Sequence, residues 1–465
     1  MKKLSYLLIV ILLFWGCSSD SEITDDEIST EQPNSESSAK ELISFSFSSN
    51  TNSIPVNSEA TLSSNSASLF LPVNTELSSL IPNFSISSKA SLYLGSQELV
   101  SGETSIDLTA PATLKVVAED GSSKNYEVTV TTAITSLTEK MNVLMDTYDI
   151  PGIQLAIVKN EKLVYQHSFG LADPANNTAV TNESLFRIAS ISKPITAIGI
   201  LKLVDDTSLS LNQRVFGTGG VLGTDYGTPP YAAGIEQITV RHLLEHTSGW
   251  TNNPFDPMFA NIDFSQSEVI DDMLDNRPLE TTPGSTYYYS NFGYSVLGRI
   301  IEKVTGQSYE AFIKSAVLSP AGISKMELGG NTLEEQYANE VVYLDQEGFS
   351  PYGTMNITRM DSHGGWLASA TDLARFITVV DRNSSRPDIV SAGGLQELYF
   401  GFQNWVFYGS LPGTSTAISR VDDEYSYVIL ANTRTIPIKS ILDNFNNILR
   451  EEILARNNWP SYDLF

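Results

Sequence analysis

The sequence predicts an α/β (α+β) fold in which helices flank an antiparallel sheet, and a small all-β sandwich precedes this domain. Two features of the hydrophobic pattern carry the prediction. Short runs of alternating apolar residues fill residues 42–132, whereas the following region has strand patterns at both ends and helical patterns between them. Strands from both ends that enclose a helical middle are expected to form one sheet with helices packed against it.

Residues 42–132 are expected to form the β-sandwich. Apolar residues recur at every second position, the period of a strand, in two stretches: Ile43, Phe45 and Phe47, and Tyr126, Val128 and Val130. Residues 119–123, Glu-Asp-Gly-Ser-Ser, are typical of a hairpin turn. The region resembles the immunoglobulin-like modules that precede catalytic domains in exported lipoproteins. It contains no histidine or cysteine, so we expect a spacer, with glycan or partner binding as the alternative.

Residues 134–458 are expected to form the larger domain. An amphipathic helix should begin the domain and end at Pro151-Gly152, because one helical face collects Ile134, Leu137, Met141, Leu144 and Met145. A hairpin around Asn160-Glu161 follows. Strand patterns return at 405–408, 414–420 and 425–430.

The N-terminus has the features of an export signal. Lys2 and Lys3 precede an apolar run that ends at Trp15, and this run is too short to remain as a membrane-spanning helix. Residues 13–17 resemble a bacterial lipobox, which implies that Cys17 is lipidated and becomes the mature N-terminus; a chance cysteine after a plain signal peptide is the alternative. We therefore expect a signal peptide over 1–16, a lipidated acidic tether over 17–41, and an exported lipoprotein of the outer membrane, on its periplasmic face or at the cell surface.

Charge and cysteine content narrow the classes of partner. The formal net charge of −26 disfavours nucleic acid and anionic membrane surfaces, because both would be repelled. The lipid on Cys17 is therefore the expected membrane contact. Since the chain has one cysteine, an intrachain disulfide is impossible.

The first segment with catalytic character is Ser190-Ile-Ser-Lys193-Pro194. A serine hydroxyl needs a base within hydrogen-bond reach to become a nucleophile. If a helix begins here, Lys193 lies on the same face as Ser190, and Pro194 indicates that this is the start of the helix. Backbone N–H groups at such a start can help to form an oxyanion hole. The similar spacing in 37–40, Ser-Ser-Ala-Lys, lies in the tether and is interpreted as coincidental.

The second segment is Tyr289-Ser-Asn291, which follows a Pro-Gly turn and precedes an apolar helix. A tyrosine near cations can lose its proton and act as a general base, and Asn291 can orient Lys193 or a substrate amide. Residues 337–339 repeat the tripeptide pattern, but they lack this context.

Four stretches together resemble the β-lactamase-related serine hydrolases, which include class C β-lactamases, D-alanyl-D-alanine peptidases and related esterases. The stretches are Ser190–Lys193, Ile238–Gly249, Tyr289–Asn291 and Gly364–Phe376. The resemblance covers roughly 151–432 and implies a β-lactamase/transpeptidase-like fold. It also implies that Ser190 is the nucleophile, that Lys193 and Tyr289 share the role of base, and that Asn291 helps to position the site.

The third motif of that family departs from the pattern. The family has a basic residue or His two positions before a Gly on the strand beside the site, and here the alignment gives Phe407-Tyr408-Gly409. The backbone N–H of Ser410 can still complete an oxyanion hole with that of Ser190. The missing charge-assisted contact should disfavour anionic substrates. His363, before Gly364-Gly365, could restore some polarity if its loop borders the cleft; an ordinary loop histidine is the alternative.

We expect no cofactor and no metal. His242 and His246 have the spacing of two metal ligands on a helix, but Leu243 stands where the metal-binding motif needs Glu. The resemblance makes this segment structural.

The predicted function is a serine hydrolase that forms an acyl-Ser190 intermediate with an ester, amide or lactam in a small molecule or peptide, and favours non-anionic substrates. One alternative is a degenerate hydrolase that serves as a surface binding or sensor lipoprotein; another is a glycan adhesin. The sequence predicts neither the substrate nor the oligomeric state.

Overall fold

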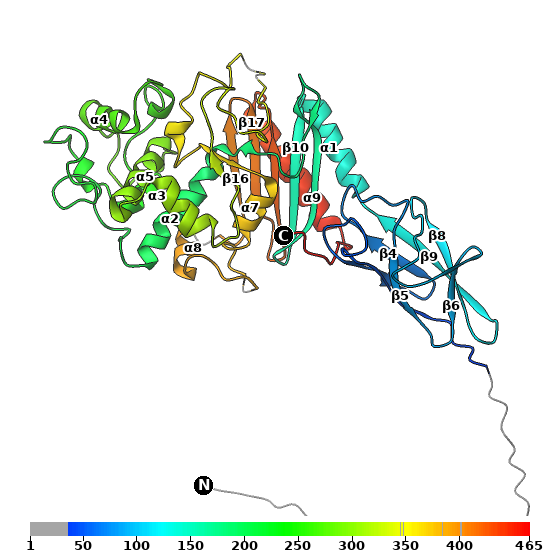
Figure 1. The fold of residues 1–465 in the computed structure, drawn as a ribbon. Helices are drawn as coiled ribbons and strands as arrows, with labels where there is room; N and C mark the ends of the chain where they lie inside the picture. Colours follow the sequence, from blue (N-terminus) through cyan, green and yellow to red (C-terminus); the bar gives the residue numbers. More distant parts are fainter. Residues whose placement is uncertain (1–35, 345, 347, 384, 400–401) are drawn as a thin grey trace, which may run out of the picture.

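A computed structural model describes residues 36–344, 346, 348–383, 385–399 and 402–465. Figure 1 shows an all-β region, blue to cyan, beside a larger region in which helices lie on both sides of a sheet. The expected signal peptide, Cys17 and most of the expected tether lie outside the described residues. In the described part, no helix has both the length and the apolar character needed to cross a membrane.

The N-terminal region consists of two small sheets that share one hydrophobic core. One has the strand order β2-β1-β5 and the other β3-β4-β9-β8-β6-β7. Phe45 and Phe47 of the first sheet pack in the same core as Leu114 and Val128 of the second. The bounds are β1 (Leu42–Phe47), β2 (Ser58–Glu59), β3 (Thr61–Leu62), β4 (Ser66–Phe70), β5 (Pro82–Ile86), β6 (Ser91–Leu94), β7 (Gln97–Leu99), β8 (Ala112–Val117) and β9 (Ser123–Thr131). The predicted all-β sandwich is therefore present, with its hairpin between β8 and β9.

The larger region is built on a sheet with the strand order β12-β11-β10-β18-β17-β16. Its strands are β10 (Gly152–Lys159), β11 (Lys162–Asp173), β12 (Thr178–Ala179), β16 (Trp405–Leu411), β17 (Thr414–Arg420) and β18 (Tyr425–Ala431). Leu155 of β10 pairs with His167 of β11 on one side and with Ile429 of β18 on the other, both antiparallel. Both ends of this region thus supply the sheet, as predicted.

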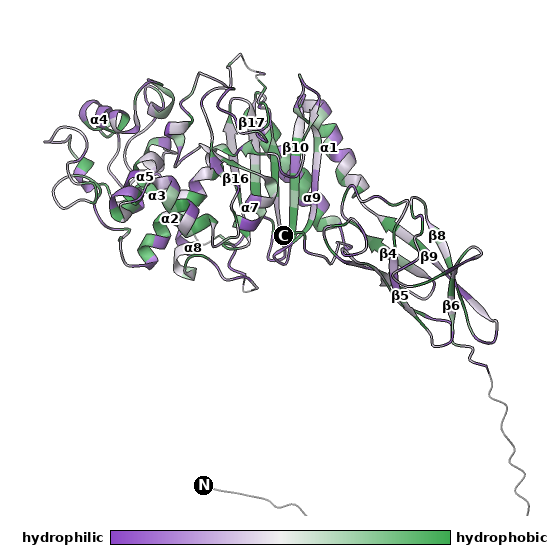
Figure 2. Cartoon of the chain, viewed as in Figure 1, coloured by the Kyte–Doolittle hydropathy of each residue, from purple (hydrophilic) through white to green (hydrophobic). Residues whose placement is uncertain are grey.

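Helices cover both faces of this sheet. Alternation along β10 puts Leu155 in the core under α1 (Thr135–Tyr148) and α9 (Ile438–Ala455), and Ala156 in the larger core on the opposite face. Figure 2 shows hydrophobic residues concentrated on the strands between these layers. Asp149 adopts a left-handed conformation that ends α1 two residues before Pro151, so the predicted end of this helix was slightly late.

The opposite face carries the other helices and a three-stranded sheet of order β13-β15-β14. The elements are α2 (Ser192–Asp205), α3 (Val240–Leu244), α4 (Gln266–Asn276), α5 (Asn291–Thr305), α6 (Tyr309–Ile313), α7 (Ala370–Ile377), α8 (Ala392–Leu398), β13 (Phe186–Arg187), β14 (Glu327–Leu328) and β15 (Trp366–Ala368). This arrangement places the 3-10 turn Ala189–Ile191, which leads into α2 and contains Ser190, the predicted reactive serine, beside β16.

Candidate active site

Ser190 lies in a single 3-10 turn, Ala189–Ile191, which leads directly into α2. The predicted position at a helix start is therefore observed, and Pro194 is the third residue of α2. Ala189 has a φ of 49°, a left-handed conformation that is unfavourable for a residue with a Cβ. Such strain persists only where the surrounding structure holds it, and here it bends the chain immediately before Ser190.

Two threonine side chains of β17 hold the backbone that precedes this turn. The Thr414 hydroxyl donates to the carbonyl of Arg187 at 2.9 Å, and the Thr416 hydroxyl donates to the carbonyl of Ile188 at 3.2 Å. Strand β13 also pairs with β15, so the approach to Ser190 is fixed from two sheets.

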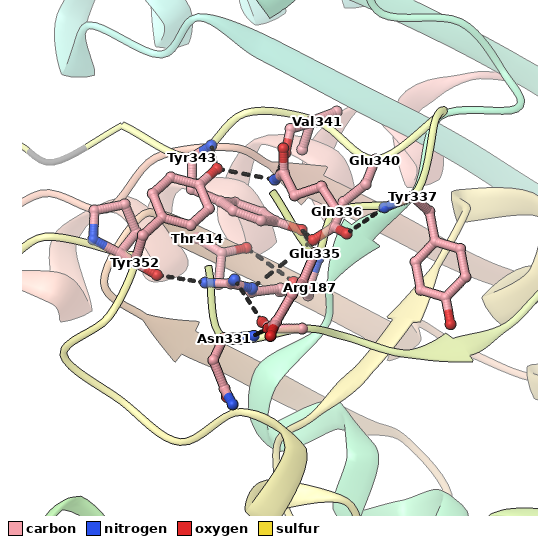
Figure 3. A network of polar contacts seen from close by, with 12 residues as sticks. Arg187, Asn331, Glu335, Gln336, Tyr337, Glu340, Val341, Tyr343, Tyr352 and Thr414 are labelled. Carbon is pink, nitrogen blue, oxygen red and sulfur yellow. Dashed lines mark hydrogen bonds and ion pairs between the residues drawn. The ribbon is translucent and has the colours of Figure 1, made fainter. Parts of the chain in front are cut away.

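The Arg187 side chain provides a third anchor for this segment (Figure 3). It is fully buried and donates to the carbonyls of Pro351, at 2.7 Å, and Gly330, at 3.1 Å. Its guanidinium lies 4.4 Å from the centre of the Tyr343 ring and 3.9 Å from the Glu340 carboxylate. These contacts tie Gly330, Glu340, Tyr343 and Pro351 to the strand that leads into Ser190.

Lys193 meets Ser190 one helical turn later, as the spacing predicted. Its Nζ lies 3.2 Å from the Ser190 Oγ and donates to the backbone carbonyl of His363 at 2.8 Å. The amine also lies 4.8 Å from the centre of the Tyr289 ring. Burial lowers the pKa of Lys193 to about 7, and the Asp256 carboxylate acts in the opposite direction. A substantial fraction of Lys193 is therefore neutral near pH 7 and can accept a proton.

Tyr289 reaches the same serine from the other side. Its hydroxyl donates to the Ser190 Oγ at 2.7 Å. Burial raises the pKa of Tyr289 to about 12, although the Ser190 hydrogen bond opposes this shift. The phenol is therefore protonated near neutral pH. The family resemblance implied that Lys193 and Tyr289 share the role of base. The two pKa values instead suit Lys193 to the role of base and Tyr289 to that of proton donor.

Asn291 begins α5 immediately after its N-cap, Ser290. Its amide donates to the Asp256 carboxylate at 2.7 Å, whereas the sequence predicted that it would orient Lys193 or a substrate amide. The Asp256 carboxylate also raises the pKa of Lys193. Asn291 therefore affects the amine indirectly, because it holds the Asp256 carboxylate that acts on it.

The His363 imidazole does not border the cavity, so the expectation that it restores polarity there was wrong. The residue is 2% exposed, because the Gly364-Gly365 turn folds it into the core, and burial holds its pKa well below the usual range. What His363 contributes is its backbone carbonyl, which accepts from Lys193.

Strand β16 forms the opposite wall. It is an edge strand, closed onto β17 by the turn between Leu411 and Thr414, so alternation directs the N–H of Ser410 to the open edge. A Cβ on Gly409 would lie 2.2 Å from the carbonyl oxygen of Ile188, so only glycine allows this approach. The predicted oxyanion donors, the N–H groups of Ser190 and Ser410, therefore belong to adjacent elements.

A cavity of about 500 Å³ opens beside Ser190. Phe407 lines it, half-buried, with its ring centre 5.3 Å from that of Trp405. Among the described residues that line the cavity, the basic side chains besides His246 are Lys193 and Arg241, and Arg241 donates to Glu245 at 3.1 Å. Arg420, another cation of the expected strand region, instead binds the Gln403 carbonyl and Asp423.

Two residues of the site were missed as contributors. His246 accepts the N–H of Ser290 through Nδ1 and lies against Tyr289, with ring centres 4.8 Å apart. Burial lowers its pKa to about 3, so it packs as a neutral ring. Asp256 caps the short helix Pro257–Phe259. An aspartate before proline indicates a turn in the sequence, and nothing local indicates that it faces Lys193.

Comparison with known proteins identifies the family. The family model described as "Beta-lactamase" matches residues 137–419. The chain belongs to the beta-lactamase family. A second model, described as "SGBP, N-terminal", matches residues 42–130 of the all-β region.

The curated relatives of this beta-lactamase family protein have different activities in their names. Penicillin-binding protein 4* of Bacillus subtilis (strain 168) is 31% identical over 315 residues, which cover 58% of this chain and 65% of the relative. Esterase EstB of Burkholderia gladioli is 30% identical over 184 residues, which cover 37% of this chain and 45% of the relative. The chain thus spans less than two thirds of either relative.

Solved structures share the fold. The D-amino acid amidase of Ochrobactrum anthropi SV3, complexed with L-phenylalanine amide, aligns with a TM-score of 0.57 at 19% identity. That alignment covers 70% of this chain and 99% of the amidase. The octameric penicillin-binding protein homologue from Pyrococcus abyssi aligns with a TM-score of 0.55 at 24% identity, and covers 70% of this chain and 78% of the homologue.

The geometry predicts that Lys193→Ala and Tyr289→Phe each lower kcat by on the order of 100-fold, the scale of losing a proton-transfer group. Tyr337→Phe is the matched control, because Tyr337 repeats the tripeptide pattern but bonds to Glu340 through its backbone: its N–H donates to the Glu340 carboxylate at 3.3 Å and its carbonyl accepts the Glu340 N–H at 3.0 Å. Steady-state kinetics on an ester substrate measures all three. A loss in Tyr337→Phe without a loss in Tyr289→Phe would contradict the assignment.

The pKa of Lys193 predicts a pH profile. If Lys193 acts as the base, its neutral amine is the active form, and kcat/KM should rise with pH through a midpoint near pH 7, the pKa of about 7. Asp256→Asn removes a charge that favours the ammonium form, so the midpoint should move to lower pH. Asp263→Asn, an exposed carboxylate on the same loop, should leave it unchanged. A midpoint that stays fixed or rises in Asp256→Asn would refute the electrostatic link.

Proposed function

We propose that this chain is an active serine hydrolase that forms an acyl-Ser190 intermediate with an ester, amide or lactam and favours non-anionic substrates. One observation carries the proposal: the Ser190 Oγ lies 3.2 Å from the Lys193 Nζ and 2.7 Å from the Tyr289 hydroxyl. A nucleophile with a base and a proton donor on either side has the parts that acyl transfer requires.

The proposed acylation follows from these contacts. Neutral Lys193 accepts the Ser190 proton while Oγ bonds to the substrate carbonyl carbon, and the carbonyl oxygen takes the negative charge. The N–H groups of Ser190 and Ser410 stabilise this oxyanion. When it collapses, the bond to the leaving group breaks, and Tyr289 supplies its proton and is reprotonated from Lys193. Water then attacks the acyl-Ser190 carbonyl by the same route, releasing the acid and regenerating the hydroxyl.

The substrate is a small molecule or peptide with a reactive acyl bond. The names of the relatives, a penicillin-binding protein, an esterase and a D-amino acid amidase, support this range. Phe407 supports the preference for neutral substrates, because a phenyl ring replaces the expected cation in the wall of the cavity.

A second candidate is a degenerate hydrolase that serves as a surface binding or sensor lipoprotein. The match of residues 42–130 to the "SGBP, N-terminal" model favours it. The paired Lys193 and Tyr289 beside Ser190 favour the enzyme, because a binding protein has no need to keep them.

The nucleophile is tested by covalent labelling. Ser190→Ala should lose all labelling by an activity-directed fluorophosphonate, while Ser37→Ala should label as wild type. Ser37 has the same spacing to a lysine but lies on the all-β region, where Lys40 binds the Ser122 hydroxyl at 2.9 Å. Peptide mass mapping locates the label. Labelling that persists in Ser190→Ala would exclude the assignment, and an unlabelled wild type would support the binding protein.

Phe407 predicts the order of substrates. Neutral esters should exceed otherwise identical carboxylate-bearing esters, and penicillins, in kcat/KM by roughly ten- to a hundredfold, the value of one charge-assisted contact. Phe407→His should reduce this difference in kcat/KM by raising kcat/KM for the anionic substrates, while kcat/KM for the neutral ester changes little. The measurement needs matched ester pairs on both forms. A wild-type preference for the anionic member would show that another group binds the carboxylate.

We also propose that the protein is exported and anchored to the outer membrane by lipid on Cys17. The match to "SGBP, N-terminal" directly after the expected tether supports this context. Cys17→Ser should move the protein from the membrane to the soluble fraction, and mass spectrometry should find acyl groups on the wild-type N-terminal peptide. A mature N-terminus elsewhere, with an unmodified thiol, would disprove the anchor.

A further inference from the structure

The cavity beside Ser190 is much longer than a small acyl group requires. It follows one face of α2 past Pro194 and Ala197 to Leu201. At a rise of about 1.5 Å per residue, Leu201 lies roughly 16 Å along the helix from Ser190. An acetyl group would leave most of this volume unfilled.

The walls of this extension are apolar. Helix α8 packs against α2 along this stretch and supplies Leu398. The remaining apolar contributions come from the loop after α2, from α3 and from β16: Leu211, Leu244, Val406 and Phe407. Ala197 and Leu201 are only 1% and 2% exposed, so they form the floor of the cavity, and a larger side chain at either position would have to enter it.

The charged side chains Arg241, Glu245 and Glu397, which also line the cavity, are paired with one another. Arg241 of α3 donates to Glu245 at 3.1 Å and to Glu397 of α8 at 2.5 Å. Two carboxylates therefore contact one guanidinium, so this group of three side chains has a net negative charge and disfavours a substrate carboxylate. A neutral group fits the length of the cavity better than an anionic one.

We propose that this cavity binds a neutral, unbranched apolar arm of roughly ten to twelve carbons attached to the scissile ester, because an extended chain with bonds of about 1.5 Å advances about 1.3 Å per carbon along some 16 Å of cavity. The inference rests on the proposed hydrolase function and names its substrate class. The arm belongs to the acyl part or to the alcohol part of the ester, and the first test below distinguishes these two cases by lengthening each part in turn.

The first test measures kcat/KM for two series of neutral esters on the wild-type protein. One series lengthens the acyl group from acetyl to decanoyl with a p-nitrophenyl leaving group; the other keeps a butyryl group and lengthens the alcohol from methyl to decyl. Because each buried methylene adds favourable transfer free energy, we expect kcat/KM to rise by at least about 30-fold from two to eight carbons in one series. A flat or falling profile in both series would overturn the inference.

The second test shortens the cavity at two depths. Ala197→Leu fills the middle, so the ratio of kcat/KM for the decanoyl or decyl ester to that for the shortest ester should fall at least tenfold, with loss already at six carbons. Leu201→Trp blocks only the deep end, so six-carbon esters should keep their advantage while ten-carbon esters lose it. Ala311→Leu, at an exposed position of α6, is the matched control and should change neither ratio.

Different results would contradict the apolar-arm inference alone and the proposed hydrolase function. Protein that is labelled at Ser190 and cleaves short esters, but shows no dependence on length, contradicts the inference alone. Protein that is neither labelled nor active on any ester contradicts the proposed function and the inference together. If Ala197→Leu does not fold, Leu201→Trp and the wild-type length profile still decide.

Discussion

The burial of the Lys193 amine against Ser190 is the constraint on which the site depends. Removing an ammonium group from water costs several kcal/mol, so burial favours the neutral form, and the pKa falls to about 7. Neutral Lys193 can take a proton from a hydroxyl, whereas the same side chain on the surface would remain charged. The Asp256 carboxylate limits the shift, and the carbonyl of His363 fixes the position of the amine. Burial destabilises the ammonium form of Lys193, so the neutral amine is available for the proposed role of base.

The rest of the fold keeps Ser190 beside this amine. Ala189 has a strained φ of 49°, and the segment before it is held by Thr414, Thr416 and the buried Arg187. The partners in those contacts lie on β17 and at Gly330 and Pro351, far from Ser190 in the sequence. The close approach of β16 brings the Ser410 N–H, the proposed second oxyanion donor, to the same site. The chemistry therefore requires the sheet, although none of the proton-transfer groups lies on it.

Local patterns predicted the elements and the helix-borne part of the site. A serine and a lysine three residues apart at a helix start share a face, so the pairing of Ser190 with Lys193 followed from their spacing together with the helix start that Pro194 indicates. The spacing alone also fits Ser37 and Lys40. The sheet from both chain ends followed from period-two runs. The family resemblance, more than any physical pattern, selected Tyr289 over Tyr337. The partner of Asn291, the burial of His363 and the position of Asp256 depend on how loops fold back, and the sequence has no local signal for such contacts. The length of the cavity depends on the packing of α8 against α2, which is equally non-local.

The central claim is that Lys193 is held largely neutral near physiological pH. Its side chain can be observed directly by NMR titration of protein labelled with carbon-13 at the lysine ε-carbons, with Lys193→Ala to assign the resonance. We predict one ε-carbon resonance that titrates near pH 7, apart from the surface lysines near pH 10.4, and disappears in the variant. A Lys193 resonance that titrates with the surface lysines would contradict the account, because the amine would then be a cation beside Ser190 and could not act as its base.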